Sequence, residues 1–536
     1  MDEFLSDIRK METEYDECSI RGICSIKPEV TAVKASVFGC LKELTFYIKK
    51  LREAGIYDDT IRDTFFTLFS ILITNFEYSE ENLAKILFDF NDKLTNLKNK
   101  YREYCLENNI SPIFYKTKIK IYSPFKLSDL IKQGQKYENN FKKQVSEEQF
   151  RGFELVLSCL KSIGLYLIEL QSLGVDITEY YDYLISACCE KERADMTKDD
   201  IISVLNNYSK FAHKLMSVLF DELKKSFGDF IETEVSASLK RGKALLVAGS
   251  NLKELQLILE ATKDKGIDVY THGQMITGHT LSEIKKYSHL VGHYGKGSEF
   301  HFTDFSNFPG VILLTNLSLF KVEDIYTSKF FTTNKIAPKN TIKIENNNFG
   351  PLIEAVLSHA ENEEEGHPKT IKAGLVEQDF FTKIEHLKEK INKGKIKNVF
   401  TIGVSNNTDS QFEYFEKFFK LLDETCFSIS ADYSRSSENM IFSKTDYTFP
   451  FLYKILDIIL PLKETTDLKV FVLTTRCNYS TIPNLIYLKS LGVNDIYYHK
   501  CSPLLINPSI MDLFAQWFDI KTYTTPDRDL NNMLKK

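Results

Sequence analysis

The chain has 536 residues, of which 43% are hydrophobic and 26% charged, which excludes an intrinsically disordered protein and leaves room for several domains. Its formal net charge is −6, so no basic field favours nucleic acid or an anionic membrane. Ten sparse cysteines argue against a secreted disulfide scaffold, and the acidic start lacks the features of a signal peptide. We therefore expect a cytoplasmic protein whose partners are proteins or small molecules.

The first part of the chain has helical periodicity. Apolar residues recur at three- and four-residue steps from Val37 to Leu51, and similar stripes cover residues 62–75, 80–105, 150–173 and 199–225. A polar interval at 133–148, with Gly, two Asn and mixed charges, predicts a break. Residues 1–235 are therefore predicted to form an all-helical domain of two sub-bundles.

The most apolar stretch of the chain, residues 153–173, is predicted to be a buried helix. Glu154, Lys161 and Glu169 interrupt it, and charged side chains are costly inside a bilayer. We therefore expect no membrane-spanning segment.

The second part of the chain alternates short apolar runs with helical stripes. This pattern starts after Arg241 and is typical of parallel sheets with crossover helices. The charged segment 361–368 contains Gly and Pro and predicts a linker. Residues 236–368 and 369–536 are therefore predicted to form two Rossmann-like α/β domains. We expect their strands at 244–248, 267–270, 311–315, 399–403, 427–431, 469–473 and 495–498.

The residues that follow these strands are mostly neutral hydrogen-bonding groups. Ligands of parallel α/β sheets bind outside the carboxyl ends of the strands, so these residues are the first candidates for a site. They can line a polar pocket or join two domain faces, and apart from Cys477 they include no thiol.

Histidine is the other signal, because five of the ten histidines fall between His272 and His301. His289 and His293 have helical spacing, but the residues around them do not predict a helix, and no third ligand has a recognisable spacing. Hydrogen-bonded loop histidines are the favoured interpretation, and a metal site is the alternative.

Several long motifs stand between residues 242 and 316. They are Asp268-Val269-Tyr270-Thr271-His272-Gly273-Gln274-Met275, then His279, then His289-Leu290-Val291-Gly292-His293-Tyr294-Gly295, and Phe308-Pro309-Gly310. In these motifs the chain resembles the hybrid cluster protein family, also called prismane proteins or hydroxylamine reductases. Weaker similarity extends over nearly the whole chain. The resemblance implies a helical domain of two bundles and two Rossmann-like domains, in agreement with the periodicity.

The resemblance also implies a hybrid iron–sulfur–oxygen cluster between the domains, a cubane cluster near the N-terminus, and reduction of hydroxylamine or nitric oxide. Matched position by position, however, the ligands of the hybrid cluster are replaced. The family's histidine falls on Ser250, and the glutamate of its T-H-G-E-M motif falls on Gln274. Its cysteines and a later glutamate and lysine fall on or near Ser318, Ser405, Tyr433, Asp446, Asn478 and Ser480.

The N-terminal cluster site is half replaced as well. Cys18 and Cys24 match the family's last two cysteines, whereas Glu3 and Ser6 stand at the first two. Hydroxyl and amide groups lack the thiolate charge that holds iron, so we expect no cofactor and interpret the substituted positions as vestigial. The residual candidates for metal ligands are Cys18, Cys24, His272, His279, His293 and Cys477.

Three functions stay open at this point. The favoured hypothesis is a cofactor-less scaffold with a binding, regulatory or assembly role and no hydroxylamine reductase activity, which acts through an unknown protein partner or self-association. The second is a metal-dependent oxidoreductase of the hydroxylamine or nitric oxide reductase type that retains an altered cluster. The third is a metal-free enzyme or receptor that uses the vacated interdomain cavity for a polar small molecule.

Overall fold

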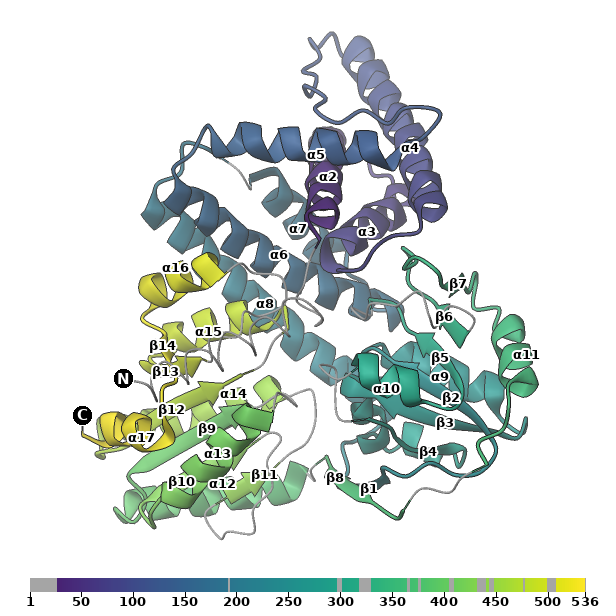
Figure 1. Ribbon diagram of the computed structural model, residues 1–536. Helices are drawn as coiled ribbons and strands as arrows, with labels where there is room; N and C mark the ends of the chain where they lie inside the picture. Colours follow the sequence, from purple (N-terminus) through teal and green to yellow (C-terminus); the bar gives the residue numbers. More distant parts are fainter. Residues whose placement is uncertain are drawn as a thin grey trace, which may run out of the picture.

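The structure is a computed structural model, and it shows a helical part and two α/β parts (Figure 1). It describes residues 27–190, 193–295, 301–317, 329–363, 367–374, 377–403, 409–430, 440–442, 448–475, 478–498 and 508–535. Nine residues named from the sequence as site positions lie outside these ranges: Glu3, Ser6, Cys18, Cys24, Ser318, Ser405, Tyr433, Asp446 and Cys477. The predicted class, helices followed by two parallel α/β parts, is confirmed.

The helical part occupies the top of Figure 1. Its described helices are α2 (Pro28–Glu53), α3 (Thr60–Ile73), α4 (Glu80–Glu107), α5 (Leu127–Lys142), α6 (Glu147–Ser172), α7 (Thr178–Glu190) and α8 (Lys198–Phe227). Capping boxes begin two of them, at Ser146 with Gln149 for α6 and at Thr197 with Asp200 for α8. These boxes satisfy backbone N–H groups that a helix end leaves without partners.

The break predicted at 133–148 is much narrower in the structure. Helix α5 runs through most of that interval, and only a short turn separates it from the cap of α6 at Ser146. Gly134 lies inside α5. The position needs a glycine because a Cβ there would stand 1.8 Å from the carbonyl oxygen of Ala32 on α2. The glycine that suggested a break therefore marks a close contact between two helices.

The first α/β part is a six-stranded sheet of order β4-β3-β2-β5-β6-β7, and all its strands pair in parallel. Its strands are β2 (Lys243–Ala248), β3 (Ile267–His272), β4 (Leu290–His293), β5 (Val311–Leu314), β6 (Phe330–Thr332) and β7 (Ile342–Lys343). Its helices are α9 (Leu252–Thr262), α10 (His301–Asn307) and α11 (Gly350–Ser358), with short 3₁₀ turns η1 (Gly273–Thr280) and η2 (Ile284–Lys286).

The second α/β part repeats this plan, with the order β11-β10-β9-β12-β13-β14, again all parallel. Its strands are β9 (Asn398–Gly403), β10 (Cys426–Ser430), β11 (Met440–Phe442), β12 (Lys469–Thr474), β13 (Asp495–Tyr498) and β14 (Lys521–Thr522). Its helices are α12 (Glu377–Asn392), α13 (Asp409–Leu421), α14 (Thr448–Ile459), α15 (Thr481–Ser490), α16 (Pro508–Phe518) and α17 (Pro526–Leu534), with the 3₁₀ turn η5 (Leu460–Glu464).

The strand orders locate the crevice of each sheet. In both sheets the chain reverses its direction of travel once, between β2 and β5 in the first and between β9 and β12 in the second. Such a reversal opens a crevice at the carboxyl ends of the two central strands, and ligands of doubly wound sheets bind there. The candidate positions Ser250 and Asn478 follow β2 and β12, which are two of these four strands.

A small antiparallel ribbon leads into and out of the first α/β part. Strand β1 (Thr233–Ser236) pairs with β8 (Thr370–Ala373), so that Thr233 lies opposite Ala373. Within the segment predicted as a linker, Asn362 forms a single antiparallel bridge with Gly242. The two ends of this α/β part therefore lie side by side.

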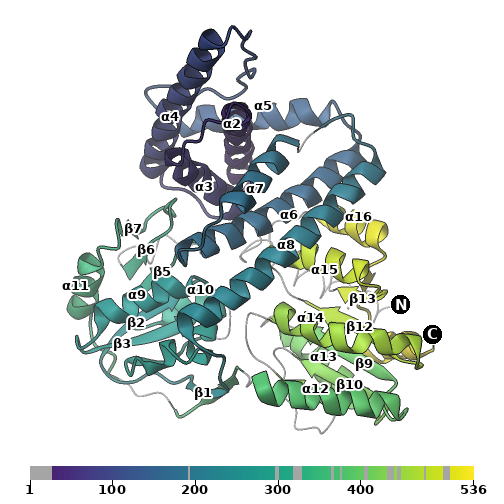
Figure 2. The ribbon, with the colours of Figure 1, turned by 180° about the vertical axis from the view of Figure 1, so that it is seen from behind.

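Both α/β parts contact the helical part. The backbone N–H of Lys339 donates to the carbonyl of Glu77 at 2.7 Å, and the N–H of Ala337 donates to Oδ1 of Asn82 at 2.9 Å. On the other side, α15 packs against α8, and α6 and α8 run diagonally through the molecule, with one end of α8 reaching down to the level of the first sheet (Figure 2). No described helix is both long and apolar enough to span a membrane.

Candidate functional site

Helix α6 joins the candidate positions of both α/β parts. The hydroxyl of Ser250 donates to Oε1 of Glu169 at 3.4 Å, and Tyr166 hydrogen-bonds Ser480. Tyr166 and Glu169 are three residues apart and share one face of the helix. One turn of α6 therefore touches a residue after β2 and a residue after β12, which makes it the centre of the candidate site.

The turn after β2 places Ser250 by its glycine and its helix cap. Gly249 has φ of +129°, and a Cβ there would stand 2.0 Å from Oγ1 of Thr315. Both the backbone conformation and the close contact therefore exclude a side chain at this position. Asn251 caps α9 by accepting from the backbone N–H of Glu254 at 3.1 Å. Ser250 is thus fixed between a close contact with the neighbouring strand end and the start of a helix.

A buried carboxyl group ties the neighbouring strand ends to α9. Glu254 accepts the backbone N–H of Asn316 at 2.8 Å and also the hydroxyl of Thr333. Burial raises the pKa of Glu254, and these two hydrogen bonds oppose the rise. The loops after β5 and β6 are therefore held to the first turn of α9, and the carboxyl edge of this sheet is a hydrogen-bonded surface.

The loop after β12 is fastened in a similar way. Oδ1 of Asn478 accepts the hydroxyls of Ser480 at 2.7 Å and Thr481 at 2.9 Å, just before α15 begins. The hydroxyl of the buried Tyr479 donates to the carbonyl of Ile73 on α3. The side chains of Asn478 and Ser480 therefore hydrogen-bond each other, and Asn478 also holds the first residue of α15.

The histidines of the first sheet lie in hydrogen bonds. His279 and His293 both hydrogen-bond Oγ1 of Thr271, at 3.0 and 2.8 Å, and Nε2 of His272 lies 3.0 Å from Oδ2 of Asp304. Burial lowers the pKa of His279 to about 3, so this ring is neutral near neutral pH. Two of the three histidines proposed as residual ligands therefore share one threonine.

The described residues do not match the ligand set of an iron–sulfur cluster. Among them, no group of three or more His, Cys, Asp or Glu side chains could hold a metal ion. Ser250, Gln274, Asn478 and Ser480 supply hydroxyl and amide groups, which are poor ligands for iron near neutral pH. No chemical step through a cluster follows from this part of the chain.

The residues that α6 contributes, Lys161, Tyr166 and Glu169, were not predicted as site residues from the sequence. Lys161 is buried, and its ammonium lies 5.7 Å from the centre of the Tyr479 ring. A signal for them exists, because charged residues interrupt the most apolar stretch of the chain. From the sequence alone, that interruption argues only against a membrane span.

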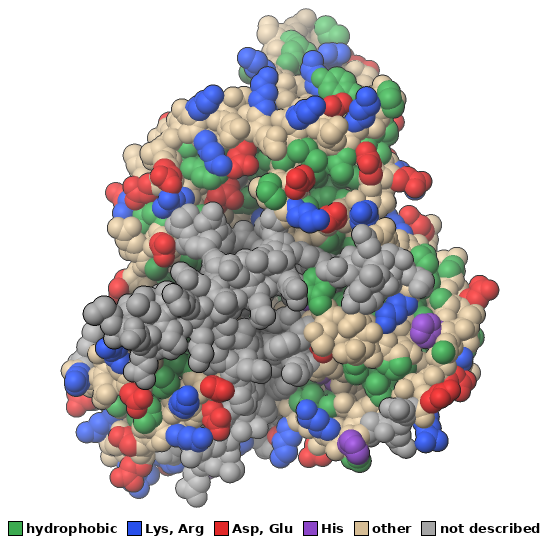
Figure 3. Space-filling model, in the orientation of Figure 1, with side chains coloured by type: hydrophobic (Ala, Val, Ile, Leu, Met, Phe, Trp, Pro, Cys, Tyr) green, Lys and Arg blue, Asp and Glu red, His purple; other side chains and the backbone are tan. Residues whose placement is uncertain are grey.

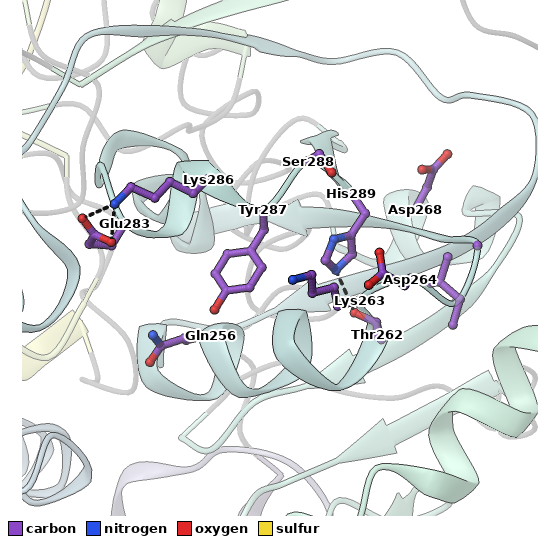
Figure 4. Close-up of a pocket in the computed structure, with 12 residues that line it drawn as sticks. Gln256, Thr262, Lys263, Asp264, Asp268, Glu283, Lys286, Tyr287, Ser288 and His289 are labelled. Atoms are coloured by element: carbon purple, nitrogen blue, oxygen red, sulfur yellow. Dashed lines mark hydrogen bonds and ion pairs between the residues drawn. The ribbon is translucent and has the colours of Figure 1, made fainter.

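A separate cavity of about 440 Å³ lies at the opposite edge of the first sheet (Figure 4). Its lining includes Thr262 at the end of α9, Asp264, and His289 before β4, and Nε2 of His289 lies 3.1 Å from Oγ1 of Thr262. Because it opens at the amino ends of the strands, it is not part of the site on α6.

Comparisons with known proteins confirm the resemblance inferred from the motifs. The model of the Prismane/CO dehydrogenase family matches residues 13–427. A hydroxylamine reductase of Thermodesulfovibrio yellowstonii is 24% identical and covers 98% of this chain and 99% of its own length. One from Rippkaea orientalis is 26% identical, with 96% of each chain covered.

One solved structure is also similar over a long stretch. It shows NiZn[Fe4S4] and NiNi[Fe4S4] clusters in alpha subunits of acetyl-CoA synthase/carbon monoxide dehydrogenase. It is 11% identical, covers 94% of this chain and 78% of its own, and has a TM-score of 0.37. At that score we draw no argument from it.

The expectation that the chain has no cofactor is contradicted by the family match and by the hydroxylamine reductases it resembles, which point to iron–sulfur and hybrid clusters. The expectation extended the loss of ligands at substituted positions to the whole chain. Yet Cys18, Cys24 and Cys477, whose thiolates suit iron, lie outside the described residues. The mismatch with a cluster therefore holds for the described positions alone.

Proposed function

The chain belongs to the Prismane/CO dehydrogenase family, and from this premise we propose that it does not reduce hydroxylamine but has a binding or regulatory role. The observation that carries the proposal is the site on α6, where Ser250, Asn478 and Ser480 are engaged in hydrogen bonds within the protein. Cluster chemistry needs thiolate, carboxylate or imidazole ligands at such positions.

The ligand we propose for this site is a polar small molecule. Hydroxyl, amide and carboxylate groups converge on it from α6 and from the loops after β2 and β12. These groups now hydrogen-bond one another, so a ligand that donates and accepts at several atoms could replace those bonds, whereas an apolar ligand would leave the groups without partners.

The proposal is tested by an activity assay with a positive control. The protein is purified without oxygen, its iron and acid-labile sulfide are measured per chain, and hydroxylamine consumption is followed with a reduced viologen dye as electron donor. The Thermodesulfovibrio yellowstonii relative is assayed beside it. We expect no turnover above the dye alone. Turnover within tenfold of the relative's rate would overturn the proposal.

The competing function is an oxidoreductase with an altered cluster. The names of the relatives and their full-length similarity favour it. It requires stoichiometric iron and sulfide together with turnover, and it requires that Cys18→Ser or Cys477→Ser lowers both. Bound iron without turnover would be compatible with the binding role and would indicate that the metal is structural.

A further inference from the structure

An extended segment, residues 110–126, crosses the projecting end of the helical part, between α4 and α5. We name it the strap. Its inward side is anchored to three helices. The N–H of Tyr115 donates to the hydroxyl of Tyr47 at 3.2 Å, and the hydroxyl of Thr117 donates to Oε1 of Glu43 at 2.7 Å. Ile119 is buried against the helices. The strap is therefore held in place on its inward side.

A glutamine on α5 fixes the middle of the strap by its backbone. The N–H of Lys120 donates to Oε1 of Gln133 at 2.8 Å, and the amide of Gln133 donates back to the carbonyl of Lys120 at 2.9 Å. Residues 116–125 make no backbone–backbone hydrogen bond with any other described residue. Side chains take the two backbone groups of Lys120 and the N–H groups of Ile113 and Tyr115, and the other backbone groups of residues 116–125 are left without a backbone partner in the described structure.

The outward side of the strap alternates with the inward side. Phe114, Lys116, Lys118, Lys120 and Tyr122 occupy every second position and are all exposed. Phe114 is 48% exposed and Tyr122 is 53% exposed. Their exposure at alternate positions, with Ile119 buried between two of them, places these five on the outward side, where the Phe114 ring also contacts Tyr101 and Arg102 of α4. The outward face therefore carries three lysines in a row, with one aromatic residue at each end.

This end of the molecule is unusual in its exposed apolar groups. Half of the ten large hydrophobic residues exposed in the described chain lie within residues 106–122, and they are Leu106, Ile110, Ile113, Phe114 and Tyr122. Figure 3 shows hydrophobic and basic side chains gathered on this projecting end. A concentration of this kind marks an interaction surface more often than chance exposure does.

The charge of the strap is opposite to that of the chain. Residues 110–136 contain six lysines and one acidic residue, Asp129, whereas the whole chain has a net charge of −6. In the described structure no acidic side chain pairs with Lys116, Lys118 or Lys120. Three exposed cations at alternate positions, about 7 Å apart, therefore have no acidic partner, and the ammonium of Lys118 lies 5.7 Å from the centre of the Tyr137 ring on α5.

We propose that the strap binds an extended acidic segment of a partner protein, with acidic residues at alternate positions and an apolar residue at each end. Such a segment adds as a strand to the open backbone, while its carboxylates face the three lysines and its apolar ends meet Phe114 and Tyr122. A membrane would require the two rings on one continuous apolar face, but the lysines separate them.

The probe is a fluorescein-labelled synthetic peptide with glutamate at three alternate positions and leucine at each end of that pattern. A scrambled peptide of the same composition is the control, and binding to the full chain is followed by anisotropy at low and high salt. We expect the patterned peptide to bind at least tenfold more tightly than the scrambled one. Raising the salt should weaken it several-fold. Equal binding of the two peptides would overturn the proposal.

Reversing the charge of the three strap lysines tests whether they bind the peptide. The variant Lys116→Glu, Lys118→Glu, Lys120→Glu should lose at least tenfold in affinity. The matched variant Lys383→Glu, Lys393→Glu, Lys417→Glu reverses three exposed lysines, on α12, just after α12 and on α13, and should change affinity less than twofold. Circular dichroism checks that both variants are folded. An equal loss in the two variants would contradict the assignment.

Three further arms separate other occupants. Vesicles of phosphatidylserine and phosphatidylcholine test a membrane, and a single-stranded oligonucleotide tests a nucleic acid. Sedimentation of the chain alone tests a second copy, whose own acidic run at 361–365 is a competitor. Tighter binding of vesicles or oligonucleotide than of the patterned peptide, or a dimer that the triple lysine variant abolishes, would overturn the proposal in favour of that occupant.

Discussion

The hydroxyl of Tyr479 is one of the groups that hold the loop after β12 to the helical part. Tyr479 donates to the carbonyl of Ile73, and both residues are buried. Tyr479→Phe keeps the ring but leaves that carbonyl without its donor, which costs about 1–3 kcal/mol. We expect a lower urea midpoint of unfolding for this variant. Tyr122→Phe, on the exposed strap, is the control and should match the wild type. Equal midpoints for the two variants would show that the hydroxyl contributes nothing.

Residues that meet in the site are far apart in the chain, which limits what the sequence could predict of it. Ser250 and Glu169 are 81 residues apart, and Tyr479 and Ile73 are 406 residues apart. The positions after the strands could be named, because carboxyl ends of parallel strands collect ligands. Their partners on α6 could not, since one sequence does not say which face of a helix meets which sheet.

At the scale of elements, buried strands were the easiest to predict. The run expected at 469–473 is β12 at Lys469–Thr474, and that expected at 495–498 is β13. Strands covered on both faces are continuous apolar runs, which leave a clear signal. The break predicted at 133–148 is longer than the observed one. A glycine that permits a close helix contact cannot be told from a glycine in a turn by sequence alone.

Gly134 gives a test with an unusual sign. Alanine is favoured over glycine inside a helix by about 1 kcal/mol, so propensity alone predicts that Gly134→Ala stabilises α5. The new Cβ, however, would stand 1.8 Å from a backbone oxygen of α2, which cannot rotate away. We expect a net loss of stability in urea unfolding. The exposed Asn140→Ala on the same helix should be neutral or stabilising. A stabilising Gly134→Ala would show that α2 and α5 shift apart freely.

The contact between α8 and the second α/β part should depend on pH. His213 on α8 stacks on Tyr487 of α15, with ring centres 4.0 Å apart, and meets the edge of Tyr453 on α14. Burial lowers the pKa of His213 from 6.5 to about 4. Between these values the unfolded chain takes up a proton that the folded chain refuses, so stability falls as the pH falls.

The measurement is the free energy of unfolding at pH 7 and at pH 5. We expect His213→Phe, which retains a stacking ring, to lose less stability over this interval than the wild type. His386→Phe, an exposed histidine on α12, is the matched control and should follow the wild-type slope. If His213→Phe also followed it, the ring would be protonated in the folded protein.

At the scale of the molecule, one fluorophore reports the docking of the second α/β part on the helices. Trp517 is the only tryptophan, and its indole N–H donates to Oε1 of Glu148 at 3.0 Å. A Cβ on Gly152 would stand 2.6 Å from the indole ring. Gly152→Val should therefore displace the ring and shift its emission to longer wavelength, with circular dichroism unchanged. Arg151→Val, one position earlier, should leave the emission maximum where it is.

The ribbon of β1 and β8 sets how the first α/β part can move. Because Thr233 lies opposite Ala373, the chain enters this α/β part from the helical part and leaves it toward the second α/β part through one two-stranded joint. A joint of two hydrogen-bonded strands resists stretching and twisting far more than a single linker does, but it bends. Mechanical load on this α/β part therefore passes through the ribbon as shear along its hydrogen bonds. Any excursion away from α6 would pivot at this ribbon, and it would also have to break the hydrogen bonds that Ala337 and Lys339 make to the helical part.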